Sequence, residues 1–598
     1  MSNALLDNVD LWTGAVRSRS TAGRGSNRKI ELAGIKKLRE LILELAVRGK
    51  LVPQDASDEP ASELLKRIEA EKAQLVKDGK IKKQKPLPPI GEDEKPFELP
   101  SGWEWVRLAS LASYIQRGKS PIYVEDSKFI VISQKCIQWS GFDVKQARFI
   151  DERSIENYSE ERFLLDNDLL LNSTGTGTVG RVVVACGSAK NNMVADSHVT
   201  VIRLLSVSSL FVCNYIKSSG IQKKIEPEAE GSLVSGTTKQ VELNTSTVNI
   251  LLTPIPPLAE QHRIVTKVDE LMQLCDQLEQ HTDQQHAAHQ QLVETLLNAL
   301  TQASSAADLA EQWQRIAAHF DGLFVGAMGE WAVDRLKDSI LQLAVMGKLV
   351  PQDPNDEPAS ELLKRIEAKK TQLIKDGKIK KQKPLPPVTD EEKPFEVPEG
   401  WEWVRFANIV DIQSGIAKGK NYNGKKTIDL PYLRVANVQR GYLVLDEIKE
   451  IQIDELDYEK YIVNPRDLLI TEGGDWDKVG RTAIWPENMD LILHQNHVFK
   501  ARLYWNKQSE IWLEKYLNGT FARDYFAGSS KQTTNLASIN KTQLSHCVLP
   551  LPPLAEQHRI VTKVDALFNL CDQLKTRIQA ANQLQLQLTD TLVQQALA

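Results

Sequence analysis

Hydrophobic residues along this chain follow two different periods, which predict two kinds of structure. After Pro257 and again after Pro553 they recur at alternating intervals of four and three residues. This heptad spacing is typical of a helix that buries one seam against another helix. No Gly or Pro interrupts either stretch, so each predicts a helix of about 40 residues and ~60 Å. The predicted seam residues are Ile264, Val268, Leu271, Cys275, Leu278, Leu292, Leu296 and Ala299 in the first stretch, and Ile560, Val564, Leu567, Cys571, Leu574, Ile578, Ala581, Leu588 and Leu592 in the second.

Residues 104–254 and 402–550 show the other pattern, in which short apolar runs alternate with turn residues. "DLLLNS" and "RVVVAC" in the first segment, and "DLLITE" and "HVFKARL" in the second, are typical of β-strands bounded by Gly-rich turns. Helices are expected at 210–222 and 510–521. Each segment therefore predicts an α/β module of about 150 residues, a usual domain size.

The chain is an internal repeat. "PLAEQHRIVTKVD" occurs at Pro257–Asp269 and, letter for letter, at Pro553–Asp565. "EPASELLKRIEA" and "KDGKIKKQKPLPP" also occur twice, 298 positions apart. We call these repeated parts the frame, and the two α/β segments, whose letters mostly differ, the inserts. A constant frame around changing inserts indicates that the frame docks to something symmetric while the inserts contact something variable.

The predicted organisation follows from the repeat. Neither seam can stay exposed, and the simplest partner for each long helix is the other copy. We predict an α+β fold with an internal two-fold pseudo-repeat: a disordered tail at 1–30, N-terminal frame helices and a basic, Pro-stiffened linker at 31–103, the first insert at 104–254, a central frame at 255–401 whose long helix spans 257–300, the second insert at 402–550, and a C-terminal coiled-coil helix at 551–598.

Composition excludes several classes of protein. The charged fraction is 26% and the net charge is −5, so no global positive charge indicates a nucleic-acid partner. No apolar run approaches the ~18 residues that would span a bilayer, so no membrane association is expected. Six cysteines without a CxxC pair fit a reducing, cytoplasmic environment.

No catalytic or metal-binding motif withstands a check of its context. "GTGTVG" at Gly175–Gly180 matches a dinucleotide fingerprint, but the apolar run after it predicts a strand and not the required helix, so a turn is expected. "RGKS" at Arg117–Ser120 lacks the first glycine of a P-loop. The D/N-P-P-Y/F loop of an adenine methyltransferase is absent, and no metal-ligand spacing occurs. His198 and His497 occupy matching places, where a turn or core role is favoured over catalysis.

Order, spacing and motifs together resemble the specificity subunit of type I restriction–modification enzymes. The features that carry the resemblance are "PLPPLAEQHRIV" after an insert and "GWEWVR" before one, with two divergent inserts between repeated frames. The resemblance implies that each insert is a target recognition domain for one half of a split, asymmetric site on double-stranded DNA. It also implies that the long helices form an antiparallel two-helix coiled coil that separates these domains and sets the spacer.

The resemblance further implies the partners and cofactors. Two methyltransferase subunits would dock on the frame, and restriction and translocase subunits would join them. S-adenosylmethionine, ATP and Mg would bind those partners, with no cofactor, metal or catalytic residue in this chain.

Loops that carry basic or amide side chains are the candidates for DNA contact. Arg can bind guanine through two hydrogen bonds, and Gln or Asn can bind adenine in the same way. The candidates are Gln116, Arg117, Lys119, Thr178, Arg181, Thr238, Lys239 and Gln240 in the first insert, and Lys418, Lys420, Asn421, Trp476, Lys478, Arg481, Lys531 and Gln532 in the second. For any one of them, an ordinary surface loop is the alternative interpretation.

Two further hypotheses stay open at this point. Residues 104–253 carry 16 basic and 16 acidic residues, and residues 402–549 carry 19 of each. Neutral inserts also fit a symmetric coiled-coil scaffold that binds two proteins. A self-contained enzyme is a third hypothesis, which the missing motifs disfavour.

Overall fold

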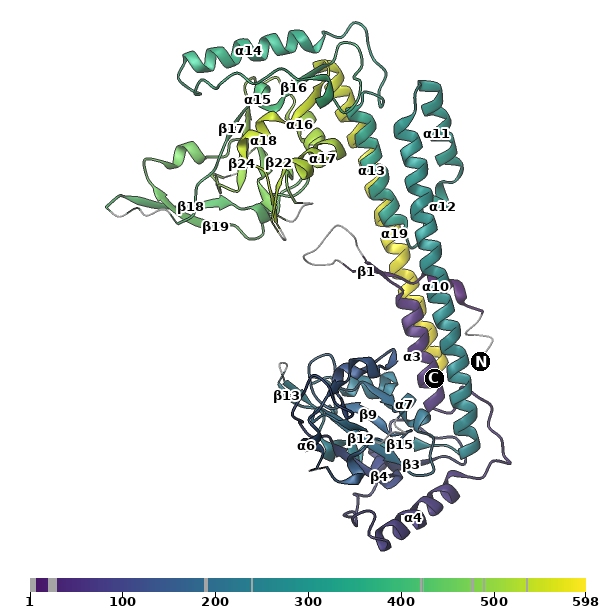
Figure 1. Ribbon diagram of the computed structural model, residues 1–598. Helices are drawn as coiled ribbons and strands as arrows, with labels where there is room; N and C mark the ends of the chain where they lie inside the picture. The colour runs from purple at the N-terminus through teal and green to yellow at the C-terminus, as the bar shows by residue number, and fades with distance from the viewer. Residues whose placement is uncertain are drawn as a thin grey trace. The chain divides into compact units, whose positions relative to one another are not determined.

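The computed structural model describes residues 7–19, 29–156, 158–187, 192–237, 240–419, 422, 424–474, 478–487, 490–533 and 536–598. They form two compact units, in which each insert is joined to helices of the frame. The first unit holds Met1–Val16, Leu32–Asp283 and Leu584–Ala598, and the second holds Arg17–Glu31 and Gln284–Gln583. The two longest helices, α10 (Leu258–Gln302) and α19 (Leu554–Leu597), each begin in one unit and end in the other (Figure 1).

In the first unit, helix α3 (Ala33–Val47) packs between the start of α10 and the end of α19. The Arg39 guanidinium lies 2.6 Å from carboxylates of both Asp276 and Glu279 on α10. The Lys37 ammonium lies 2.5 Å from Asp590 of α19, and Lys50, just beyond α3, donates to the carbonyl oxygen of Leu597 at 2.8 Å. The sequence order of these contacts makes α19 parallel to α3.

The start of α10 runs the other way. Glu260, in its first turn, accepts hydrogen bonds from Gln54 and Trp103, which follow α3, whereas Asp276 meets Arg39 in the first half of α3. The long helices are therefore antiparallel within this unit. The predicted α+β fold class with antiparallel long helices is confirmed, but the coiled coil predicted to have two helices has α3, one of the predicted frame helices, as a third member.

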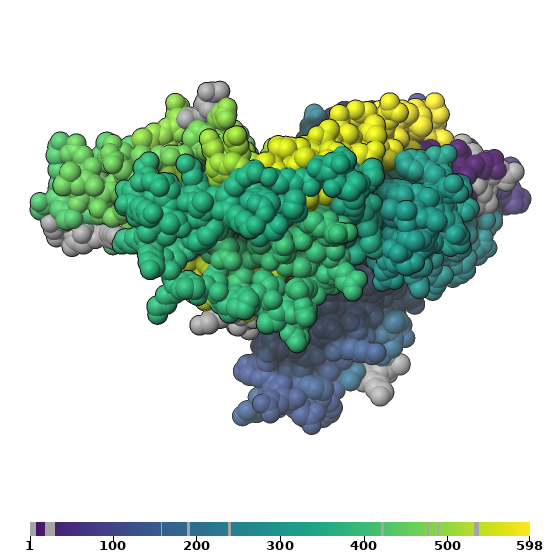
Figure 2. All heavy atoms as spheres, turned by 90° about the horizontal axis from the view of Figure 1, so that it is seen from above, coloured from purple at the N-terminus to yellow at the C-terminus, as the bar shows by residue number. Residues whose placement is uncertain are grey.

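The second unit repeats this bundle with helix α13 (Gly329–Val345) in the place of α3. Lys337 pairs with Asp572, and Lys575 lies 2.7 Å from Asp334, both against α19. Lys348 donates to the carbonyl oxygen of Ala303, at the end of α10, at 2.8 Å. One hydrophobic core continues from this bundle into the second insert. Figure 2, in which the molecule is seen from above, shows part of α19, in yellow, at the surface.

The seam predicted from heptads is buried in its first half and displaced in its second. Ile264, Val268, Leu271, Cys275, Ile560, Val564 and Cys571 are buried, and Leu278, Leu567 and Leu574 are half-buried. Further along, the prediction is wrong by one residue. Leu292 and Leu588 are 51% and 50% exposed, and the buried positions are Val293 and Thr589. A straight helix turns every 3.6 residues, so its buried stripe drifts away from a strict seven-residue repeat.

Residues 7–19 contradict the prediction of a disordered tail at 1–30. They form helix α2 (Val9–Gly14) and strand β1 (Arg17–Arg19), and β1 pairs with β2 (Lys29–Glu31). Trp12 is fully buried, and Ala15 joins Ala33 and Leu586 in a small core. The low-complexity composition predicted disorder, but the segment contains one large aromatic residue, Trp12, whose burial holds it against the rest of the unit.

The first insert is built on an antiparallel four-stranded sheet in the order β10-β9-β12-β4. A three-stranded sheet β11-β5-β8 and three strand pairs, β15-β3, β6-β7 and β13-β14, surround it. The strands are β3 (Glu104–Arg107), β4 (Ala112–Arg117), β5 (Ile130–Ile132), β6 (Ile137–Gln138), β7 (Gly141–Phe142), β8 (Arg148–Phe149), β9 (Leu169–Asn172), β10 (Val182–Val184), β11 (Met193–Ala195), β12 (Val199–Leu204), β13 (Ser235–Thr237), β14 (Gln240–Glu242) and β15 (Leu252–Ile255).

The second insert repeats this topology with β17-β24-β20-β22 as its central sheet. The sheets β19-β18-β23 and β21-β26-β25 and the pair β16-β27 complete it. The strands are β16 (Glu402–Arg405), β17 (Val410–Gln413), β18 (Thr427–Leu433), β19 (Lys449–Asp454), β20 (Leu468–Thr471), β21 (Gly473–Gly474), β22 (Thr482–Ile484), β23 (Leu493–His494), β24 (Val498–Leu503), β25 (Lys531–Thr533), β26 (Leu536–Ser538) and β27 (Val548–Leu551).

The single helices predicted at 210–222 and 510–521 are each two helices. Ser218 and Gly519 take extended backbone conformations that break them. The insert helices are α5 (Leu108–Leu111), α6 (Glu152–Ile155), α7 (Ser209–Lys217), α8 (Ser219–Lys224) and α9 (Thr245–Ile250), then α15 (Phe406–Ile409), α16 (Glu510–Asn518), α17 (Thr520–Ser529) and α18 (Lys541–His546). The frame adds α4 (Ala61–Lys77), α14 (Ala359–Lys375), α11 (Ala306–Ala318) and α12 (Phe320–Phe324).

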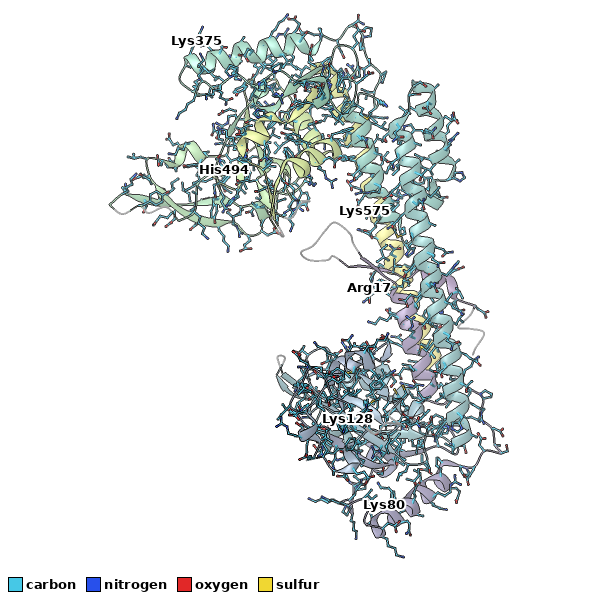
Figure 3. The ribbon with its side chains drawn as sticks, viewed as in Figure 1. Arg17, Lys80, Lys128, Lys375, His494 and Lys575 are labelled. Carbon is cyan, nitrogen blue, oxygen red and sulfur yellow. The ribbon has the colours of Figure 1, made fainter. Side chains whose placement is uncertain are left out.

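The basic linkers after α4 and α14 are held against the inserts. The Arg107 guanidinium donates to the carbonyl oxygen of Pro89 at 3.0 Å and lies 2.8 Å from Glu94. Arg405 repeats these contacts with Pro387 and Glu392. Lys80 and Lys375, labelled in Figure 3, lie where α4 and α14 end. No helix in the described part of the chain has the length and hydropathy to span a membrane.

One buried acid makes the stability of the second unit depend on pH. Glu514 on α16 is 7% exposed, and burial raises its pKa to about 7. Between the ordinary value of 4.5 and about 7, the folded chain keeps a proton that the unfolded chain loses. The free energy of unfolding therefore falls as pH rises through this window.

We predict that Glu514→Gln removes this pH dependence, because an amide has the shape of the protonated acid and never ionises. The variant should be more stable than the parent at pH 8, by on the order of 1–3 kcal/mol, and close to it at pH 4. Thermal midpoints at both pH values measure the effect. Glu450→Gln, at an exposed position of β19, is the control, and equal midpoint shifts in the two variants would contradict the prediction.

Candidate nucleic-acid interface

The loops at one edge of each central sheet come together because the strands are antiparallel. In the first insert β4 and β9 end, and β12 begins, at the same edge. Arg117 pairs with Thr200, and Asn172 with Val199. In the second insert Gln413 of β17 pairs with Lys500, and Thr471 of β20 with Val498. We call this part of each insert the loop edge.

Arg117 ties three parts of the loop edge together. Its guanidinium lies 2.7 Å from the Glu242 carboxylate and donates to the carbonyl oxygens of Leu243 at 3.1 Å and Ser173 at 3.4 Å. The side chain is 27% exposed. Arg117 therefore holds strand β14 and the β9 end in place, and part of it still reaches the surface.

The second insert has a different residue at this place. Gly118 and Gly415 occupy equivalent positions, because a Cβ on either would clash with a backbone oxygen of the neighbouring strand, that of Ala195 or His494. Ser414 is thus the counterpart of Arg117. The backbone N–H of Lys119 donates to Ala195, and that of Ile416 donates to His494, so Ile416 and not Lys418 is the counterpart of Lys119.

The turn predicted at Gly175–Gly180 is confirmed. Gly175, Gly177 and Gly180 have φ angles of 95°, 76° and 85°, and strand β10 follows. The Thr178 hydroxyl donates to the carbonyl oxygen of Thr174 at 3.0 Å. This hydroxyl lies 2.5 Å from where a Cβ on Gly175 would be, so a side chain is excluded there. The turn is therefore closed by a side-chain hydrogen bond and depends on glycine at its first position.

The arginine that follows the turn has the same partner in both inserts. Arg181 donates to the side-chain oxygen of Gln138 at 2.7 Å, and Arg481 donates to that of Gln439 at 2.6 Å. Arg181 also donates to the carbonyl oxygen of Gly177 at 2.8 Å. Both arginines are half-buried. These pairs link the turn to the segment after β5 or β18.

The matched histidines lie on the surface of the loop edge. His198 Nδ1 lies 2.7 Å from the Thr174 hydroxyl, and His497 Nδ1 lies 2.8 Å from a Glu472 carboxylate oxygen. Both side chains are exposed. Glu472 has Ser173 as its counterpart, because the backbone N–H groups of these two residues donate to the carbonyl oxygens of His497 and His198. The matched histidines therefore meet different chemistry, the hydroxyl of the residue after Ser173 in the first insert and a carboxylate in the second.

The remaining candidates are placed less closely together. Gln116 accepts from Arg162 at 3.3 Å, and the Lys119 ammonium lies 5.4 Å from the centre of the Tyr158 ring. Lys418 is exposed, and the side chain of Lys478 lies against Gly474. Thr238, Lys239, Lys420, Asn421 and Trp476 lie outside the described residues. Gln240, Lys531 and Gln532 are in strands β14 and β25, with only their backbone described.

Gln134, Gln138 and Gln439 are polar residues of the loop edge that the sequence analysis missed. The Gln134 amide donates to the carbonyl oxygen of Thr174 at 2.5 Å and to its hydroxyl at 3.0 Å. A signal for two of them was present, since "CIQ" and "NVQ" place Gln138 and Gln439 at corresponding points of otherwise divergent inserts.

Buried charged groups away from the loop edge serve the scaffold. Arg203 lies 2.7 Å from buried Asp168, and Arg502 lies 2.6 Å from buried Asp467, at the opposite end of the sheet. Burial lowers the pKa of His494, labelled in Figure 3, to about 3, so its ring is neutral. Its Nδ1 lies 2.7 Å from the carbonyl oxygen of Val498. Among the residues that the structure describes, no cluster of His, Cys, Asp or Glu could hold a metal ion.

Comparison with known protein families gives two matches, one around each insert. A family model described as the type I restriction modification DNA specificity domain matches residues 100–285 and again residues 398–583. The chain belongs to this specificity family. It is 43% identical to the type I restriction enzyme EcoAI specificity subunit of Escherichia coli, over 99% of both chains. It is 42% identical to the EcoEI specificity subunit of Escherichia coli, again over 99% of both.

The matched segments cover each insert and the first half of the long helix that follows it. The predicted family and the internal repeat are thus confirmed.

We predict that Arg117→Ala loosens strand β14 without unfolding the insert. Loss of the hydrogen bonds to Leu243 and Ser173 should cost about 1 kcal/mol each. Amide hydrogen exchange of β14 should therefore accelerate about tenfold or more. Ser414→Ala, at the equivalent position, should leave exchange in β26 unchanged, and unchanged protection of β14 in Arg117→Ala would show that the arginine has no such role.

Proposed function

We propose that this chain is the DNA-recognition subunit of a type I restriction–modification complex and binds a bipartite, asymmetric site on double-stranded DNA. Each loop edge contacts one half-site. The observation that carries the proposal is that two inserts of the same fold present different side chains at equivalent positions. The inserts share the order of their central sheets and the Arg–Gln pair, whereas Arg117 and Ser414, or Ser173 and Glu472, differ at equivalent positions.

The charge balance supports a division of labour between subunits. Phosphate contacts supply most of the affinity for DNA and base contacts supply the specificity. The inserts are electrically neutral, with 16 basic and 16 acidic residues in 104–253. Isolated, the chain should bind DNA weakly, and the partner methyltransferase subunits should supply the bulk of the phosphate contacts by closing around the duplex.

The same proposal assigns the chemistry to partner subunits. Two methyltransferase subunits would use S-adenosylmethionine to methylate adenine N6, and restriction subunits would use ATP and Mg for translocation and cleavage. This chain would be non-catalytic, and its frame would dock both methyltransferase subunits. The letter-for-letter repetition of "PLAEQHRIVTKVD", "EPASELLKRIEA" and "KDGKIKKQKPLPP" within the frame supports this, because identical partners need identical surfaces.

Exchange of one insert tests the proposal directly. Replacing 107–254 with an insert from another specificity protein should change one half-site and leave the other intact. The reason is that each loop edge is built entirely from its own insert. Single-molecule sequencing of methylated adenines in cells that carry the complex measures both half-sites. A result in which both halves stay the same, or in which both change, would contradict the proposal.

A second experiment tests whether the long helices set the spacer between the half-sites. One heptad inserted into both helices, near His281 and Ala580, should lengthen the spacer by about 3 base pairs, since seven residues add ~10 Å. Insertion into α10 alone is the control and should disrupt the pairing of the helices. An active complex that keeps its original spacer after the double insertion would argue against this role.

A further inference from the structure

The two basic linkers, at 77–89 and 375–387, concentrate positive charge in a chain whose net charge is −5. Both read "KDGKIKKQKPLPP", so each carries five lysines and one aspartate. All of the lysines are exposed, and none has an ion pair or a side-chain hydrogen bond with another residue that the structure describes. They are Lys77, Lys80, Lys82, Lys83 and Lys85 in the first copy, and Lys375, Lys378, Lys380, Lys381 and Lys383 in the second.

Residues other than these lysines hold the linkers against their inserts. Arg107 and Arg405 donate to the carbonyl oxygens of the last proline of each linker. In the first copy the Lys72 ammonium, on α4, donates to the side-chain oxygen of Gln84 at 2.9 Å. In the second copy Leu385 packs against the hydrophobic core of the unit. The backbone that carries the lysines is therefore fixed without the use of their charges.

Each linker lies at the end of its central sheet opposite the loop edge. Lys72, which holds the first linker, also donates to the carbonyl oxygen of Ala109 at 2.6 Å, just before β4 begins, whereas Arg117 ends β4 at the loop edge. In the second copy the Gln382 amide donates to Asp411, near the start of β17, at 3.4 Å. A strand of six residues spans ~20 Å. A duplex on the loop edge would therefore lie a strand's length away from these lysines.

The identity of the two linkers is not a general property of the repeat. Helices α3 and α13, which have the same packing role in the two units, differ at most positions, and the inserts differ more. An exposed side chain without a partner in its own chain can be replaced at little cost to the fold. Lysines that match at every position of the two linkers therefore indicate a ligand that meets both copies in the same way.

We infer that each basic linker binds an acidic surface of one methyltransferase subunit, an inference that rests on the proposed function. Two identical surfaces fit two identical subunits. Exposed lysines fit carboxylates on the facing subunit, because complementary charge guides association and suppresses wrong partners. The position of the linkers leaves the loop edge of each insert free for DNA while the subunit is docked.

Removal of charge from one linker tests the inference in the absence of DNA. The full chain with Lys80→Gln, Lys82→Gln and Lys83→Gln is mixed with the methyltransferase subunit, and mass photometry counts the subunits bound to each chain. One of the two docking sites should weaken about tenfold, the combined effect of three exposed charge pairs, and the other should keep its affinity. Docking to the parent chain should weaken as the salt concentration rises, and less steeply at the altered linker.

Matched variants make the result specific. The same change in the second linker should weaken the other site equally; its substitutions are Lys378→Gln, Lys380→Gln and Lys381→Gln. Arginine at the three positions of the first linker keeps the charge and should dock as the parent does. A control removes three charges from exposed lysines outside the linkers and should also dock as the parent; its substitutions are Lys145→Gln, Lys223→Gln and Lys541→Gln. All variants should keep the thermal midpoint of the parent, because no contact within the chain is lost.

Two results would overturn the inference. One is a linker variant that binds both methyltransferase subunits as tightly as the parent does, and the other is an equal loss of docking in the control variant. If the linker variant docks normally but its complex binds an unrelated duplex more weakly, the linkers bind DNA phosphates and the inference is wrong. The proposed function is judged separately, by the preference of the parent complex for the mapped site over a duplex with one scrambled half.

Discussion

The antiparallel packing of two long helices is the constraint on which the rest of this protein depends. The heptad stripes of α10 and α19 must be buried, yet each half of each helix offers only one apolar face. Burial is achieved in each unit by a short helix, α3 or α13, that lies antiparallel to the start of one long helix and parallel to the end of the other. The frame of each insert is thus completed by a helix that begins at the other insert. Neither repeat could form its complete bundle alone.

The same bundle is held by different charged pairs in the two units. Arg39, Lys37 and Lys50 hold α3 between the long helices, and Lys337 and Lys348 hold α13. Lys50 meets the carbonyl oxygen of Leu597, and Lys348 meets that of Thr301, its counterpart in the other long helix. The closest repetition of the frame lies instead in α4, α14 and the linkers after them, where "EPASELLKRIEA" and "KDGKIKKQKPLPP" return unchanged, whereas α3 and α13 differ at most positions.

The repeat allowed the sequence to predict a large part of the fold. Strand character in the inserts, the long helices and the turn at Gly175–Gly180 came from local periodicity and glycine placement, which depend on nearest neighbours. The errors have three different causes. Trp12 orders a segment of low complexity, Ser218 and Gly519 divide predicted helices, and the buried stripe of each long helix moves by one residue at Val293 and Thr589.

The candidate interface, too, could be predicted from the sequence only in part. The motifs "PLPPLAEQHRIV" and "GWEWVR" around two divergent inserts carried the resemblance to the family, and residue type indicated the polar loops. These are properties of residue type and order. Which of those side chains meet is decided only by the tertiary structure, in which Arg117 contacts Glu242 and Leu243 and Arg181 contacts Gln138. Antiparallel pairing brings residues more than a hundred positions apart to one sheet edge. No local pattern encodes that proximity, because it depends on the register of strands that meet only after the chain has folded.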